Sequence, residues 1–87
     1  MPIDEELLRP TREYISHLNG LIAKAEQVMV ERIERYAHDD AEYAYQISKE
    51  YHLSVEPLRR QRDAAVKIIA DYYGLQRLPS APTTLTN

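Results

Sequence analysis

The side chains best suited to binding a metal ion form one polar cluster, His38, Asp39, Asp40 and Glu42. On a helix, His38 and Glu42 would lie one turn apart, a spacing that a metal ion can bridge. The same residue types have a simpler use, because Asp caps helix N-termini and His is favourable at a helix C-terminus. We therefore expect a helix junction at residues 38–40, with no metal ion and no cofactor.

The side chains that act as nucleophiles in enzymes lack the surroundings that such chemistry needs. The chain has no cysteine, which excludes thiol catalysis, disulfides and zinc–thiolate sites. No serine lies in a glycine-flanked turn, and the two glycines, Gly20 and Gly74, are too far apart to form a phosphate-binding loop. We predict that the protein is not an enzyme.

A possible nucleic-acid site lies in the segment 44–63, with the sequence AYQISKEYHLSVEPLRRQRD. Its apolar residues and one small residue at the helix crossing, Ser48, have a spacing that resembles the helix-turn-helix motif of DNA-binding regulators. The apolar residues are Ile47, Tyr51, Leu53 and Leu58. The resemblance implies that three side chains of the second helix point toward phosphates or guanine edges, namely Arg59, Arg60 and Arg62. The motif covers a small part of the chain.

The overall charge disfavours that interpretation. The formal net charge is −3 and the isoelectric point is about 5.5, whereas DNA-binding domains carry an excess of basic residues. The charge is also uneven along the chain. Residues 1–57 hold 12 acidic and 6 basic side chains, and residues 58–87 hold 2 acidic and 5 basic ones. DNA binding is therefore the alternative and not the first prediction.

Tyrosine supplies all seven aromatic side chains of the protein, and four of them crowd into residues 36–51. Tyr43 and Tyr45 are about 200° apart on a helix, so they cannot both face one core. One of them is then either an ordinary half-exposed side chain or part of a binding surface, and tyrosine is enriched at protein interfaces. We predict a partner interface that includes Tyr36, Tyr43 and Tyr45.

An amphipathic stripe runs through the first half of the chain. Its members follow a spacing of three and four residues that stops at Arg32, namely Ile15, Leu18, Ile22, Ala25 and Met29. The stripe has two interpretations, a face packed inside a helical bundle or a seam for self-association. For the second interpretation, we take Ile15, Leu18, Ile22 and Met29 as candidate interface residues.

Prolines, glycines and helix-capping residues predict where the helices begin and end. Pro10 or Thr11 opens the first helix, which breaks near 38–40 in preference to running on to residue 51. A second junction is expected at residues 52–54, where Ser54 would cap a last helix that Gly74 stops. No segment has the alternation of a β-strand.

The composition places the chain among small globular proteins. Hydrophobic residues make up 44% of its 87 residues and charged residues 29%. No apolar run reaches the roughly 18 residues of a membrane span, and acidic residues occupy the place of a secretory signal. We therefore expect a cytoplasmic protein that is not membrane-bound.

The sequence predicts an all-α fold of two or three helices, a hairpin or a small bundle with a long first helix. One domain covers residues 1–78, and residues 79–87 form a disordered tail. A core of this size is thin, so we expect association with another chain. The predicted function is protein–protein interaction, as an adaptor, inhibitor or assembly factor, with a homodimer as one form. The alternative is a helix-turn-helix regulator that binds DNA through residues 44–63.

Overall fold

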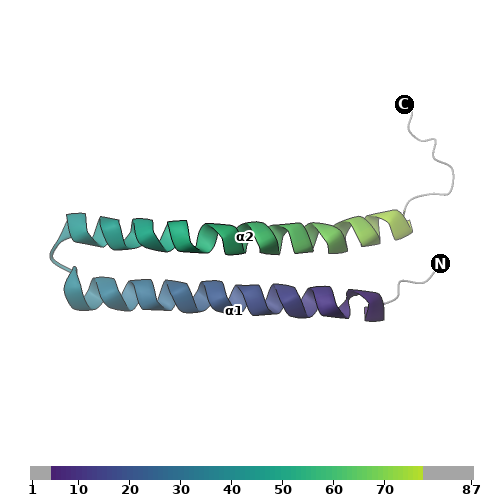
Figure 1. The fold of residues 1–87 in the computed structure, drawn as a ribbon, viewed down its shortest axis with the longest axis horizontal. Helices are drawn as coiled ribbons and strands as arrows, with labels where there is room; N and C mark the ends of the chain where they lie inside the picture. Colours follow the sequence, from purple (N-terminus) through teal and green to yellow (C-terminus); the bar gives the residue numbers. More distant parts are fainter. Residues whose placement is uncertain (1–4, 78–87) are drawn as a thin grey trace, which may run out of the picture.

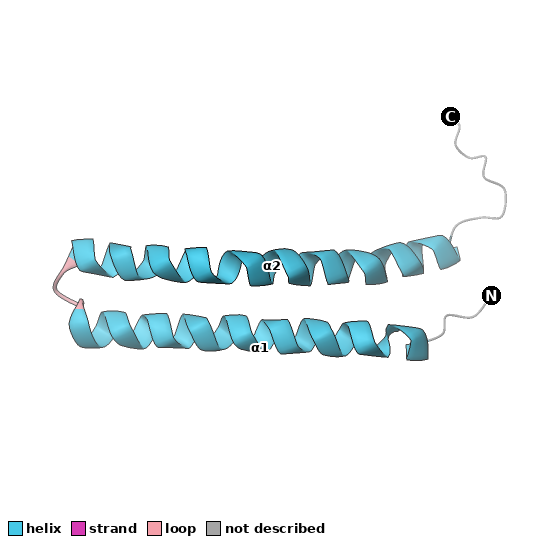
Figure 2. Ribbon diagram, viewed as in Figure 1, coloured by secondary structure: helices cyan, strands magenta, loops and turns pink. Residues whose placement is uncertain are grey.

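Two long helices, packed antiparallel, make up the part of the protein that the computed structural model describes, residues 5–77 (Figure 1). Helix α1 spans Glu5–Tyr36 and α2 spans Ala41–Arg77, and only residues 37–40 lie between them (Figure 2). The predicted all-α hairpin with a long first helix is confirmed. The predicted tail, 79–87, lies outside the described residues.

The turn between the helices is built around Asp40, as the sequence predicts. The Asp40 side chain accepts a hydrogen bond from the backbone N–H of Tyr43 (3.0 Å), and its carbonyl accepts one from the N–H of Ala44 (2.9 Å). This is N-cap geometry, and such a cap stabilises a helix by about 1 kcal/mol. The cap opens α2 and directs the chain back along α1.

The helices pack along a single apolar seam. At its centre, Ile22 of α1 meets Tyr51 and Val55 of α2, and all three are buried. Tyr51 keeps its hydroxyl group hydrogen-bonded, because Arg59 donates to it at 3.1 Å. Half-buried side chains extend the cluster on both helices, namely Ala25, Met29 and Leu58.

This seam is the whole core of the described residues. Each helix packs against only one other helix, so most of its circumference remains exposed. The largest side chains that are completely removed from solvent are Ile47 and Val55. The buried side chains are Leu8, Leu18, Ile22, Ala37, Ile47, Tyr51, Val55 and Ala65.

Both helices extend beyond the boundaries that the sequence predicts. Helix α1 begins at Glu5 and contains Pro10. Leu8, upstream of the proline, is buried, and this burial stabilises the helical conformation of the residues before Pro10. Helix α2 continues through Gly74, which has helical rather than left-handed backbone geometry. A glycine inside a helix costs about 1 kcal/mol, which does not end a helix whose other residues pack well.

The predicted junction at residues 52–54 is wrong, because α2 runs through it without a break. The Ser54 hydroxyl donates to the carbonyl of Tyr51 (2.9 Å) and does not cap a new helix. Pro57 removes the hydrogen bond to the carbonyl of Leu53, but both residues lie on the exposed side. Burial of Val55 and its neighbours on the seam outweighs that loss.

The continuity of α2 predicts the effect of replacing Pro57. In a helix interior, proline is about 3 kcal/mol less favourable than alanine, so Pro57→Ala should raise the free energy of unfolding by about 1–3 kcal/mol. Urea titration followed by circular dichroism measures the change. As a control, Gln46→Ala at another exposed position of α2 should change stability by less than about 0.5 kcal/mol. A neutral Pro57→Ala would instead fit a proline in the first turn of a separate helix.

Candidate interaction surface

The sequence-predicted interface residues occupy two different environments. Leu18 and Ile22 are buried between α1 and α2, and Ile15 and Met29 are half-buried on the same seam. A partner could reach Leu18 or Ile22 only if the hairpin opened. The stripe therefore packs within the chain, as the first of its two interpretations expects.

The three tyrosines lie near the turn and are exposed. Tyr36 is in the last turn of α1, with the guanidinium of Arg35 6.0 Å from the centre of its ring. Tyr43 and Tyr45 lie in the first turns of α2, and Tyr45 is the more exposed of the two. Tyr43 and Tyr45 point about 200° apart around α2, so these two side chains do not share one face of the helix.

A second row of apolar side chains on α1 flanks the seam on one side. In the sequence, Leu21 and Val28 only widen the amphipathic stripe, and the row is not among the predicted interface residues. Leu7, Tyr14, Leu21 and Val28 follow one another at intervals of seven residues, and all four are exposed. A seven-residue interval keeps side chains on one face of a helix. The seven-residue interval is therefore the sequence pattern that identifies this row. It is hard to recognise because each of its members lies next to a residue of the seam.

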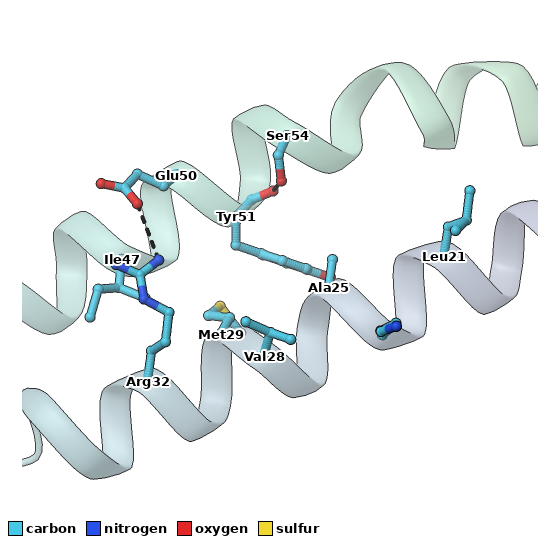
Figure 3. A pocket seen from close by; sticks show the side chains of 10 residues that line it. Leu21, Ala25, Val28, Met29, Arg32, Ile47, Glu50, Tyr51 and Ser54 are labelled. Carbon is cyan, nitrogen blue, oxygen red and sulfur yellow. Dashed lines mark hydrogen bonds and ion pairs between the residues drawn. The ribbon is translucent and has the colours of Figure 1, made fainter.

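Three members of this row, Tyr14, Leu21 and Val28, line one wall of a groove between the helices. In its part nearer the turn, Leu21 and Val28 face Ile47 and Ser54 of α2 across a hollow of about 470 Å³ (Figure 3). The ring of Tyr51 forms the floor of the hollow and points toward α1 (Figure 3).

An ion pair crosses the groove near its turn end. Arg32 of α1 approaches Glu50 of α2 with an N–O distance of 3.3 Å (Figure 3). Both side chains are more than one-third exposed, so the pair contributes little to stability. It places polar groups at the rim of an apolar hollow.

The groove continues toward the chain ends on the same side of the hairpin. A second hollow of about 420 Å³ has Tyr14 on one wall and Gln61, Ala64 and Ile68 on the other. The hydroxyl of Tyr14 donates to the side-chain oxygen of Gln61 (2.8 Å) and links the two walls. Ile68 is 58% exposed, and Leu75, seven residues further on, is 68% exposed. We call this side, with the row on α1 and these residues of α2, the groove face.

The opposite flank of the seam combines polar contacts with a smaller hollow of about 310 Å³, lined by Arg12, Ile15, Asn19 and Ile69. Near the chain ends, Arg12 donates hydrogen bonds to the Tyr73 hydroxyl (2.6 Å) and to the carboxylate of Glu5 (2.9 Å). Tyr73 in turn donates to the other carboxylate oxygen of Glu5. These three side chains join the start of α1 to the end of α2.

The arginines of the predicted recognition helix are held by the hairpin itself. The guanidinium of Arg59 lies 5.7 Å from the centre of the Tyr51 ring, and Arg62 donates to the side-chain oxygen of Asn19 (3.2 Å). Arg60 forms an ion pair within α2, one turn from its partner. Because residues 44–63 belong to one uninterrupted helix, the helix-turn-helix geometry that the sequence predicted is not formed.

Among residues 5–77, no three metal-ligating side chains come together, and His38 lies 2.9 Å from the carboxylate of Asp39. Neither helix has a stretch apolar enough to cross a membrane. Comparisons of the chain with protein families, curated proteins and solved structures find no match.

The link between Glu5 and Tyr73 predicts a measurable pH effect. The hydrogen bond from Tyr73 lowers the pKa of Glu5, desolvation opposes this, and the charge of Arg12 lowers it further. The resulting stabilisation is present above the ordinary carboxyl pKa and is lost as pH falls through the lowered one. Tyr73→Phe should raise the pKa of Glu5, as carbon-detected NMR titration would show. Tyr45→Phe, far from Glu5, should leave that pKa unchanged.

Proposed function

We propose that this protein is a non-enzymatic helical interaction module that binds another helical surface through the groove face. It would act as an adaptor, an inhibitor or an assembly factor. The observation that carries the proposal is the row of Leu7, Tyr14, Leu21 and Val28, which stays exposed beside an already formed seam. A surface helix of a self-sufficient domain turns a single apolar stripe toward its core.

The groove face has the composition of a protein interface. Apolar walls surround the two hollows, and polar groups such as Lys24 and the pair of Arg32 with Glu50 lie at their rims. An apolar centre within a polar rim is the usual anatomy of such interfaces. The row and the α2 residues opposite it expose on the order of several hundred Å² of apolar surface, approaching the roughly 800 Å² per partner of a standard interface.

The thin core supports the same proposal. Chains below about 70–80 residues of folded structure depend on disulfides, metal ions or association for added stability. This chain has no cysteine, and residues 5–77 bring no metal-ligating cluster together. Each Å² of apolar surface removed from water contributes about 25 cal/mol. Covering the groove face would therefore add the burial that one seam cannot supply.

Substitution of Leu21 tests whether the groove face binds a partner. A photoreactive phenylalanine analogue at Tyr14 should form cross-links to protein in living cells. Leu21→Asp should reduce these cross-links at least tenfold, because it buries a charge in the groove. The side chain of Leu21 is 41% exposed in the free hairpin, so the dichroism of the variant should remain helical.

Ala23→Asp is the matched control for Leu21→Asp. Ala23 is exposed on the same helix and lines neither hollow, so this variant should cross-link as the unchanged protein does. Absence of any cross-link at Tyr14, or cross-links that survive Leu21→Asp, would contradict the proposed function.

A further inference from the structure

We propose that the partner on the groove face is a second copy of this chain, packed with its hairpin reversed end for end. The inference rests on the proposed function and names its partner. The arrangement is a two-fold symmetric pair in which the same face is used twice, the commonest form of oligomer. Two hairpins joined in this way make a four-helix bundle, in which every helix packs against two neighbours.

Charge is distributed unevenly along the folded hairpin. Contacts of Arg12 with Tyr73, Tyr14 with Gln61 and Asn19 with Arg62 place the first half of α1 beside the second half of α2. The half with the chain ends, counted over residues 5–21 and 59–75, then holds 6 basic and 5 acidic side chains. The half with the turn, residues 22–58, holds 4 basic and 8 acidic ones.

With histidines neutral, these residues give the two halves of the hairpin net charges of +1 and −4. Two hairpins packed in the same direction would place the acidic halves side by side, which is unfavourable. Reversal places each acidic half beside a basic half. Such complementarity selects the orientation of partners more than it adds affinity, and it weakens as salt shortens the Debye length from about 10 Å at 0.1 M.

The groove face also differs in shape between its two ends. Its most exposed apolar side chains, Leu7, Ile68 and Leu75, all lie in the half with the chain ends. The larger hollow, between Leu21 and Ser54, lies toward the turn. A two-fold axis between the two hollows places the protruding side chains of each copy over the larger hollow of the other.

Spin labels can measure the orientation, since the chain has no cysteine of its own to compete for a label. Glu34 and Arg9 are exposed and line neither hollow, so Glu34→Cys and Arg9→Cys should leave the groove face intact. In the reversed pair, two labels at position 34 lie about 40 Å apart along the bundle, at 1.5 Å per residue. A label at position 34 and one at position 9 of the other copy lie at the same level.

Pulsed electron spin resonance on each variant and on their mixture gives these distances. We expect the 34-to-34 distance to exceed the 9-to-34 distance by more than about 20 Å, and Leu21→Asp to remove both. We also expect self-association, followed by sedimentation, to weaken at least several-fold between 0.05 and 0.5 M salt. Self-association that salt does not change would overturn the role of charge in selecting the orientation, which the distances measure directly.

The remaining outcomes separate this inference from the proposed function. A 34-to-34 distance shorter than the 9-to-34 distance would overturn the reversed orientation and leave groove-face binding intact. A monomer at 100 µM that still cross-links through Tyr14 to a different protein in cells would overturn the second copy as partner. A monomer that also forms no such cross-link would overturn both proposals.

Discussion

The packing of α1 against α2 along one apolar seam is the interaction on which the rest of this structure depends. Ile22, Tyr51 and Val55 lie at its centre, and the helical form of the flanking residues follows from keeping them buried. Long helices are marginal in water without such packing. The seam therefore explains why the chain tolerates Pro10 and Pro57 inside helices, where local propensity alone would predict breaks.

Because the helices pack along a single seam, side chains on both of its flanks remain exposed, and the two flanks differ in character. On one flank, Arg12 and Arg62 make hydrogen bonds to the opposite helix, beside a smaller hollow of about 310 Å³. On the other flank, Leu21, Val28 and Ile68 border open hollows. Because apolar side chains gain free energy only when they leave water, the second flank is the side that benefits from a partner.

The hairpin also changes the meaning of the charge asymmetry in the sequence. Along the chain, acidic residues predominate before residue 58 and basic ones after it. Folding brings residues 59–77 beside the start of α1, which itself carries Arg9 and Arg12, so the asymmetry becomes a polarity along the long axis. Ion pairs between the helices, such as Arg32 with Glu50, are exposed and contribute little. The charge therefore bears more on the orientation of a partner than on the hairpin itself.

The sequence by itself determined the all-α class, the turn at residues 38–40 and the stripe of α1 that packs inward. These features depend on local signals, the cap of Asp40 and a periodicity of 3.6 residues, which act over one or two helical turns. The continuity of α2 and the groove face were decided by tertiary structure. Ser54 and Pro57 are local signals for a junction, but the burial of Val55 against α1 has the larger free energy, and no local pattern records it. In the same way, the sequence alone places Leu21 with the stripe of α1. Only the position of α2 shows that Leu21 lies beside the seam and remains exposed.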